Sequence, residues 1–408
     1  MSLIKRMMEE HESSVARGYS IPESGERFLC SCHYDNIYLK DFIRNNGIDG
    51  TCTYCGRKGI VIDFAMFVGF VGGRLSEYLE DLDAAGLPSA KAFYDDDEEE
   101  IPGFARRGYY IAPADVEYYA SNGEAMYDIG LISDSDELND DLSSHLFLED
   151  KIRRDPTSLL LSEELSFLWK QFCDLVKKRQ RYTFFKSLLF ERTTTDHSAH
   201  GLEDILSELG NLIHMVEEIL PTGTVIYRCR PAKKEDVVSG FRDLTSPPVS
   251  KAKSNRMSPT GISMFYGSFE KETPIIETKH YSKDPLAYLG KFRTTRQLLV
   301  INLFSAPEAD FWMPSGWQEY GFLNRFHQEI SKPVGPNDVD EIEYGPSQVF
   351  TEYLRYLCKN SRGEYYDGII YRSAMTNKKN IVLFYDQESS SNVLELIGCN
   401  EEIEWGEW

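Results

Sequence analysis

The order of apolar and polar residues divides the chain into a helical front half and a strand-rich back half. Between Asp63 and Leu82 apolar residues recur at helical spacing, which predicts an amphipathic helix. Two more apolar stripes lie within residues 156–220, and the Pro221-Thr-Gly223 turn ends the second. The stripes are Leu161, Leu165, Leu168, Trp169, Phe172 and Val176, and then Leu202, Ile205, Leu206, Leu209, Ile213, Val216 and Ile219.

After Gly223 the pattern changes to short apolar runs rich in β-branched and aromatic residues, which predict strands. These runs are 224–229, 262–266, 298–304, 368–371, 381–385 and 393–397. Helical spacing returns between them, near 285–289, 322–330 and 348–357. Helices followed by a mixed, strand-rich unit predict an α+β chain with two main parts.

Charge and hydropathy narrow the class of protein. The 408 residues suffice for two or three domains, and 66 acidic against 44 basic side chains give a net charge of −22. This balance argues against nucleic acid as a partner, because binding to phosphates needs a basic face. The longest apolar stretch, 60–71, is interrupted by Asp63 and is too short to span a bilayer. The N-terminus lacks the apolar segment of a signal peptide, so we expect a cytoplasmic protein without membrane contact.

Half of the eight cysteines are concentrated near the N-terminus, in Cys30-Ser-Cys32-His33 and Cys52-Thr-Tyr-Cys55. In a reducing compartment such a cluster more often holds a metal than forms disulfides. The pattern predicts structural Zn²⁺ bound by Cys30, Cys32, Cys52 and Cys55, with His33 as an alternative to Cys30, because four protein ligands leave no open position for chemistry. The alternative interpretation is that the four cysteines are buried and bind no metal.

Three segments of the back half carry polar residues that a β-rich core does not need. They are Val225-Ile-Tyr-Arg228-Cys-Arg230, then Asn255-Arg256-Met-Ser-Pro-Thr-Gly261 leading to Tyr266 and Glu277, and then Gly368-Ile-Ile-Tyr-Arg-Ser373 followed by Asn380-Ile-Val-Leu-Phe384. In this order and spacing they resemble the RES domain, which is named for its arginine, glutamate and serine. Ser347-Gln-Val-Phe-Thr-Glu352 resembles a helix start that the family usually has, whereas Met257 stands where the family often has an aromatic residue.

The resemblance covers about residues 222–400, and the front half resembles the HEPN/RES N-terminal domain. It implies an ADP-ribosyltransferase-like mixed α/β fold for a RES catalytic domain at 221–408. A helical accessory region of the HEPN/RES type would cover 61–220, and the zinc-binding module 1–60. Many RES proteins are toxins that degrade cellular NAD⁺ and are inhibited by an antitoxin. We therefore expect NAD⁺ as substrate and an antitoxin or other regulatory protein as partner. Whether the chain forms a homo-oligomer is left open by the sequence.

The resemblance also assigns roles to the catalytic candidates Arg228, Glu277 and Ser373. Cleavage of the nicotinamide–ribose bond passes through an oxocarbenium-like state, which a carboxylate can stabilise. Glu277 fits that role or a hydrogen bond to the ribose hydroxyls. Arg228 would hold the pyrophosphate through its planar guanidinium, and Ser373 would orient the carboxamide or the ribose.

The substrate-binding candidates are Arg256, Tyr266, Tyr227 and Arg230. Arg256 would be the second pyrophosphate ligand, and Tyr266 offers a ring on which nicotinamide could stack. Tyr227 and Arg230 are second choices in the strand of Arg228. Each of these residues alone could be an ordinary ion-pair, core or turn residue, and only their combination predicts a site.

Three functions remain to be compared. The first is an NAD⁺ glycohydrolase or phosphorylase, the second an ADP-ribosyltransferase acting on a macromolecule, and the third a zinc-bearing recognition module whose RES domain binds a nucleotide without turnover. The complete residue set favours an enzyme. In transferases of the fold that the resemblance implies, an acid or a glutamine two residues before the glutamate often engages the acceptor. Here Ile275 stands at that position, and Pro274 interrupts any strand that would align Glu270 or Glu272 with Glu277. The resemblance therefore implies a small nucleophile. Arg192 and His197 have the spacing of HEPN ribonucleases, but their threonine-rich run predicts a loop.

Overall fold

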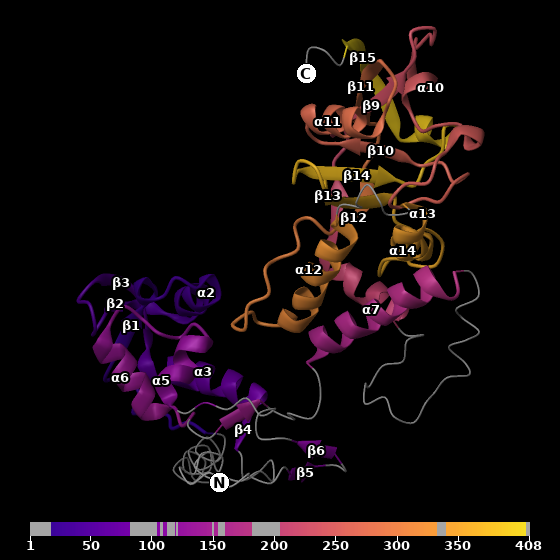
Figure 1. Ribbon diagram of the computed structural model, residues 1–408. Coiled ribbons are helices and arrows are strands. Elements are labelled where there is room, and N and C mark those ends of the chain that lie inside the picture. The colour runs from indigo at the N-terminus through magenta and orange to yellow at the C-terminus, as the bar shows by residue number, and fades with distance from the viewer. Residues whose placement is uncertain are drawn as a thin grey trace. The chain divides into compact units, whose positions relative to one another are not determined.

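The computed structural model describes most of the chain and divides it into two compact units (Figure 1). Unit 1 comprises Met1–Leu159 with Asp310–Trp317, and unit 2 comprises Leu160–Ala309 with Gln318–Trp408. The described residues are 18–81, 104–106, 109–111, 119, 121–148, 151–153, 160–181, 205–332 and 340–404. Arg192 and His197 lie outside them.

Unit 1 contains a three-stranded antiparallel sheet, in the order β1-β3-β2, and helices that share one core with it. The helix expected after Asp63 is confirmed as α3, and the Asp63 carboxylate caps it by accepting from the Ala65 N–H at 2.8 Å. The described elements are β1 (Phe28–Cys30), η1 (Ser31–His33), α2 (Ile37–Asn46), β2 (Ile48–Thr51), β3 (Lys58–Asp63), α3 (Phe64–Tyr78), β4 (Leu79–Asp81), β5 (Phe104–Arg106), β6 (Tyr109–Ile111), α5 (Asn122–Asp128), α6 (Asp136–His145) and β7 (Lys151–Arg153). The short strands pair as β4 with β7 and β5 with β6.

A segment from much later in the sequence completes the core of unit 1. Asp310–Trp317 belongs to this unit although the chain before and after it belongs to unit 2. Trp312 is only 2% exposed, and its indole N–H donates to the Ile129 carbonyl at 2.7 Å. Arg74 donates to the Met313 carbonyl at 2.9 Å. We call Asp310–Trp317 the anchor segment.

Unit 2 is built on an eight-stranded sheet in the order β15-β11-β9-β10-β14-β13-β12-β8. Among its described strands, β12 and β13 pair in parallel and the other neighbours pair antiparallel. Its described elements are α7 (Leu161–Lys178), α9 (Ile205–Leu212), η4 (Ile213–Val216), β8 (Glu217–Leu220), β9 (Val225–Ala232), α10 (Phe241–Leu244), η5 (Val249–Lys251), β10 (Phe265–Ser268), α11 (Glu272–Tyr281), β11 (Leu286–Thr294), β12 (Leu298–Asn302), α12 (Trp317–Ser331), α13 (Asp340–Glu343), α14 (Gly345–Tyr356), β13 (Gly368–Arg372), β14 (Lys379–Leu383), η6 (Ser389–Asn392) and β15 (Leu394–Glu404).

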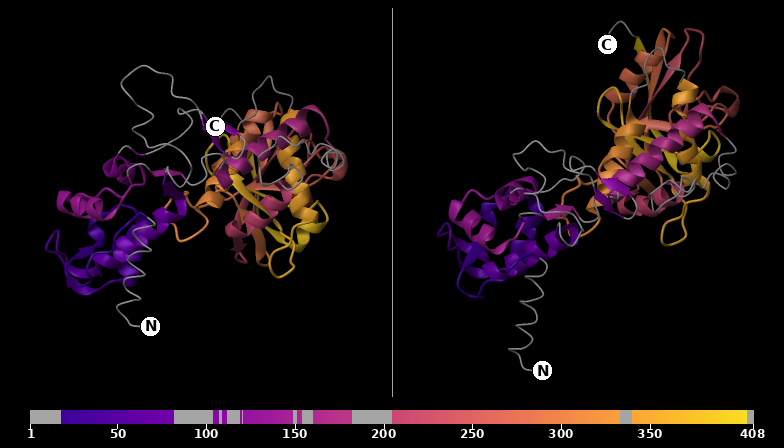
Figure 2. Two further views of the ribbon diagram at one scale, coloured as in Figure 1. Left: turned by 90° about the horizontal axis from the view of Figure 1, so that it is seen from below. Right: turned by 60° about the horizontal axis from the view of Figure 1, so that its bottom comes forward.

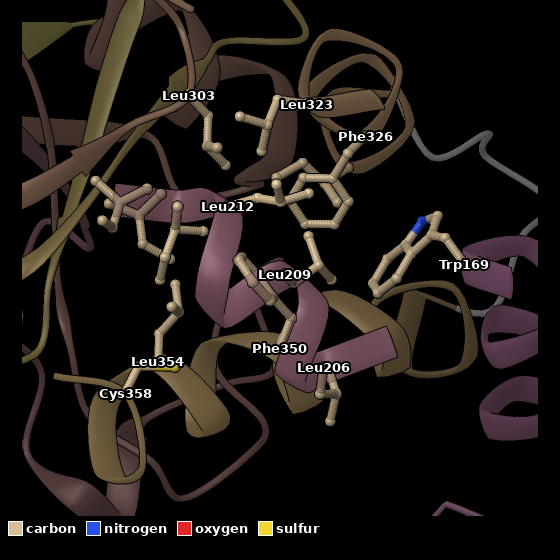
Figure 3. Packing of buried hydrophobic residues seen from close by; sticks show 14 of the residues in the cluster. Trp169, Leu206, Leu209, Leu212, Leu303, Leu323, Phe326, Phe350, Leu354 and Cys358 are labelled. Carbon is tan, nitrogen blue, oxygen red and sulfur yellow. The ribbon is translucent and has the colours of Figure 1, made fainter. Parts of the chain in front are cut away.

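The largest core of unit 2 joins the sheet to α7, α9, α12 and α14 (Figure 3). Figure 2 gives two further views of the ribbon of this unit. Trp169 on α7 meets Phe326 on α12 edge to face, with ring centroids 4.8 Å apart. The stripe predicted around Trp169 thus faces the core, as amphipathic spacing requires. A second core contains Phe265 and Phe292, 5.1 Å apart between centroids. None of the helices in the described ranges is both long and apolar enough to cross a membrane.

Two expectations about the elements of unit 2 were wrong. The helix expected near 285–289 is the start of strand β11, which lies between β15 and β9. Leu286, Ala287 and Leu289 are all buried, so the polar alternation that would mark a strand is missing. The second helical stripe ends at Val216, and Ile219 lies in the edge strand β8.

Candidate active site and candidate metal centre

Glu277 forms the centre of a compact polar cluster in unit 2. The Ser373 hydroxyl donates to Glu277 Oε1 at 2.6 Å, and Asn380 Nδ2 donates to the same oxygen at 2.8 Å. Ser373 and Asn380 are almost fully buried, with 0% and 3% exposure. Because both bonds end on Oε1, Oε2 is left for a bound group. The structure thus joins the predicted glutamate and serine through an asparagine that was not singled out from the sequence.

The helix that carries Glu277 corrects an assumption made from the sequence. Glu277 lies on α11, so Pro274 does not interrupt a strand. Pro274 is in the first turn of this helix, where the missing N–H would have no partner within the helix. Ser373 follows β13 directly, and its hydroxyl also accepts from the backbone N–H of Thr376 at 3.2 Å. These bonds fix the serine in a tight turn and aim its proton at Glu277.

Tyr371 is a second residue that sequence reasoning missed. It pairs with Asn380 across β13 and β14, and it is 7% exposed. Burial, and next the charge of Glu277 and the neighbouring Tyr266, raise the pKa of Tyr371 well above its usual value. The hydroxyl therefore stays protonated and available as a hydrogen-bond donor. The residue stood within the serine motif, but only the strand register places it beside the carboxylate.

Arg228 is half-buried and held by main-chain carbonyls. Its Nη1 donates to the Tyr266 carbonyl at 2.7 Å and its Nε to the Thr245 carbonyl at 3.2 Å. Burial lowers the pKa of Arg228 to about 10, which still leaves the guanidinium charged at physiological pH. Neutral carbonyls satisfy N–H groups without cancelling the charge, so the positive potential remains available to an anion.

Arg256 is held in a similar way at the end of α12. Its Nη1 donates to the Ile330 carbonyl at 2.5 Å and its Nη2 to the Lys332 carbonyl at 2.8 Å. A cation at a helix C-terminus is also favoured by the helix dipole. Among the residues that the structure describes, neither Arg228 nor Arg256 forms an ion pair.

The first turn of α14 holds the loop that carries Arg256. The Ser347 hydroxyl donates to the Arg256 carbonyl at 2.5 Å, and Gln348 Nε2 donates to the Asn255 carbonyl at 2.8 Å. Thr351 reaches the sulfur of Met257, which is fully buried. Met257 stands where the family often has an aromatic residue, and it therefore lies in the core and not on a surface that a substrate could touch.

Three further candidates from the sequence have defined surroundings. The Tyr266 hydroxyl lies 2.9 Å from the Ser258 hydroxyl, and burial raises the pKa of Tyr266 above its usual value. Tyr227 packs against the apolar cluster that includes Ile275 of α11. Arg230 donates to the Asp243 carbonyl at 2.7 Å and faces the Asp243 carboxylate at 4.0 Å. Tyr227 and Arg230 thus have ordinary structural partners.

The cysteine cluster of unit 1 groups Cys30, Cys32 and Cys55 with His33, whereas the sequence predicted Cys52 in this set and His33 only in place of Cys30. The sulfur atoms of Cys30, Cys32 and Cys55 lie 2.9 to 3.7 Å apart, and His33 belongs to the same group of donors. Four ligands at a Zn–S distance of about 2.3 Å would place tetrahedral sulfurs about 3.8 Å apart. Cys52 lies beside them, with its sulfur 3.3 Å from His33 Nε2. The donor set and its spacing fit a zinc ion.

Local structure explains how these donors converge. The hairpin turn that carries Cys55 closes with the Gly56 N–H donating to the Cys52 carbonyl at 2.9 Å, and Gly56 has a φ of 71°. That backbone conformation favours glycine. On the other side, His33 Nδ1 lies 2.8 Å from the Asp134 carboxylate, an arrangement that commonly orients a metal-binding histidine.

Two family models match the chain, one in the part that carries the candidate active site and one in the part that carries two of the cysteines. The family model described as "RES domain" matches residues 225–405, and the one described as "HEPN/RES N-terminal domain 1" matches residues 45–188. The first range contains every candidate for the active site, whereas the second includes Cys52 and Cys55 but not Cys30 and Cys32. Arg192 and His197 fall in neither range. No curated protein and no solved structure matched the chain.

Proposed function

We propose that this chain, which belongs to the RES-domain family and carries a HEPN/RES-type N-terminal domain, cleaves NAD⁺ at the nicotinamide–ribose bond. The observation that carries the proposal is the Glu277 carboxylate, held by Ser373 and Asn380 through one oxygen, in the domain that also contains two arginines that form no ion pair with any described residue. A half-buried negative charge in the same domain as cationic groups suits a substrate with a cationic ring at one end and a pyrophosphate in the middle.

The proposed reaction breaks the bond between ribose C1′ and the nicotinamide nitrogen. The electron pair of this bond goes to the ring, which leaves as neutral nicotinamide. An oxygen of water or phosphate then forms the new bond to C1′ and releases a proton. The Glu277 carboxylate stabilises the positive charge that develops on the ribose, as carboxylates do in glycoside cleavage.

The remaining residues bind and orient the substrate in this proposal. Arg228 and Arg256 attract the pyrophosphate, and the Tyr266 ring provides a stacking surface for nicotinamide. Ser373 orients Glu277 through its 2.6 Å hydrogen bond. The fold proposed for this domain is that of the ADP-ribosyltransferases. Its mixed sheet, with one parallel strand pair, is compatible with that architecture.

We also propose that the protein is a toxin whose activity an antitoxin or another regulatory protein restrains. Zn²⁺ would be a structural ion in unit 1, bound by Cys30, Cys32 and Cys55 together with Cys52 or His33. Such an ion would hold β1 to the β2–β3 hairpin without a catalytic role.

One incubation tests the reaction. The full-length protein is mixed with NAD⁺ labelled on the adenylate, and small molecules are separated from macromolecules. We expect free nicotinamide together with labelled ADP-ribose or ADP-ribose 1-phosphate. Label found mainly on protein or nucleic acid would instead identify an ADP-ribosyltransferase. Unchanged NAD⁺ that is nevertheless bound by the protein would identify a recognition module.

A further inference from the structure

Tyr371 carries a hydroxyl proton that has no acceptor in the part of the chain that the structure describes. Its side chain is 7% exposed, and no described residue accepts a hydrogen bond from it. Tyr366 shows the usual arrangement, because it is 3% exposed and its hydroxyl donates to Glu217 at 2.5 Å. An unpaired donor in a nearly buried side chain is uncommon in folded proteins and calls for a partner outside the chain.

Asn380 sets the distance between this hydroxyl and Glu277. Tyr371 and Asn380 are register partners in β13 and β14, so their side chains share one face of the sheet. Asn380 Nδ2 donates to Glu277 Oε1 at 2.8 Å, and the Asn380 amide also donates to the Tyr371 hydroxyl. The two hydrogens of an amide nitrogen diverge by about 120°, so its two acceptors lie about 5 Å apart. This gap is too wide for a direct hydrogen bond between Tyr371 and Glu277.

The surroundings of Tyr371 keep the proton on its oxygen. Burial raises the pKa of Tyr371 most, followed by the charge of Glu277 and the neighbouring Tyr266. Arg256 and the hydrogen bond from Asn380 lower this pKa, the latter because a donated hydrogen bond stabilises a phenolate. The pKa stays well above its usual value, so the hydroxyl is a neutral donor at physiological pH.

A single hydroxyl group of a ligand fits between Tyr371 and Glu277. A hydroxyl accepts one hydrogen bond while it donates another, and its two partners then lie about 5 Å apart. The ligand oxygen would accept from Tyr371 and donate to the carboxylate, whose Oε2 is used by neither Ser373 nor Asn380. An ionised phosphate oxygen has no proton for Glu277, and an amide nitrogen has no lone pair for Tyr371. The arrangement therefore selects a hydroxyl.

We propose that Tyr371 binds the 2′-hydroxyl of the nicotinamide ribose by donating to the same oxygen whose proton Glu277 accepts. The inference rests on the proposed function and deepens it. This hydroxyl is attached to the carbon next to C1′, so a carboxylate bound to it lies close to the charge that develops on C1′. Asn380 is then a positioning residue, because its amide holds the two partners at the spacing that one hydroxyl bridges.

Removal of the Tyr371 hydroxyl alone tests the proposal in the full-length protein. Tyr371→Phe keeps the ring and removes a donor that has no acceptor in the protein, so we expect the melting temperature to change little. Turnover and binding are measured with NAD⁺ and with the analogue that lacks the 2′-hydroxyl of the nicotinamide ribose. We expect the variant to lose about ten-fold or more in kcat/KM for NAD⁺ and nothing for the analogue. The intrinsic reactivity of the analogue cancels, because both proteins receive the same compound.

The matched control is Tyr366→Phe, which removes a buried hydroxyl that donates to Glu217. Loss of this bond to a carboxylate should lower the melting temperature, whereas the preference for NAD⁺ over the analogue should stay as in the wild type. Asn380→Ala is a second test variant. It keeps the Tyr371 hydroxyl but removes the amide that sets the spacing, so the same preference should fall.

The outcomes separate this inference from the proposed function. A wild type that cleaves NAD⁺, together with a Tyr371→Phe variant that retains the preference for NAD⁺ over the analogue, would overturn the role of Tyr371 alone. An equal loss with both compounds would do the same, because Tyr371 would then act on water or on the fold. A wild type that neither binds nor cleaves NAD⁺ would end the proposed function and this inference with it.

Discussion

Replacing Glu277 with glutamine separates the charge of this residue from its hydrogen bonds. Ser373 and Asn380 both donate to Oε1, so the glutamine carbonyl can occupy the same position and accept both bonds. The Nε2 amide then replaces Oε2, the oxygen that these two bonds leave for a substrate. We therefore expect the free energy of unfolding to change by less than about 1 kcal/mol, while the negative charge is lost.

The loss of this charge sets the expected effect on the rate. A unit charge about 4 Å away contributes about 4 kcal/mol at an effective dielectric constant of about 20. An oxocarbenium shares its charge between two atoms, so we expect a loss of about 2–4 kcal/mol. That loss corresponds to a turnover about 30 to 1000 times slower. The measurement is release of nicotinamide by Glu277→Gln at saturating NAD⁺, together with a denaturation curve.

The control is Glu272→Gln, which removes an exposed carboxylate from the same helix. It changes the net charge equally but should leave the rate as in the wild type. A rate for Glu277→Gln within about three-fold of the control, in a protein of unchanged stability, would refute the catalytic role of this carboxylate.

Three more predictions concern other parts of the chain. Protein purified without chelator should contain about one zinc per chain, lost in Cys55→Ser and kept in Cys173→Ser, and a folded preparation with only trace zinc would contradict the metal centre. Arg256→Lys keeps the charge but cannot bind the Ile330 and Lys332 carbonyls as a planar fork. We expect kcat/KM to fall by an amount that corresponds to about 1–3 kcal/mol of transition-state stabilisation. Unchanged kinetics would place Arg256 outside the site. Trp312→Ala should destabilise unit 1 by about 3–5 kcal/mol in calorimetry, whereas the exposed Phe147→Ala should have little effect, and equal melting curves would show that the anchor segment does not belong to this core.

Sequence reasoning identified the family because the three motifs retain their polar residues in order. Glu277 and Ser373 both belong to those motifs, and the structure brings them together in a hydrogen bond. Asn380 and Tyr371 stood in the same motifs but were passed over. Their side chains face the carboxylate only because β13 and β14 pair Tyr371 with Asn380, and a register of this kind is not visible in a single strand.

Sequence reasoning also could not predict contacts between residues that lie far apart in the sequence. The carbonyls that bind Arg256 belong to residues more than seventy positions later, at the end of α12. Strand β11 was taken for a helix because burial on both faces removed its alternation. Nothing in the apolar pattern around Trp312 indicated that this tryptophan would fill the core of the other unit.

The anchor segment has a consequence for the order in which the protein folds on the ribosome. N-terminal domains generally fold first as the chain emerges during synthesis. Here unit 1 cannot close its core until Trp312 has left the ribosome, by which time β9, β10, β11 and β12 of unit 2 have already been made. The β13 and β14 strands, which supply Ser373 and Asn380, come later still. The unit that begins the chain is therefore completed before the candidate active site can exist.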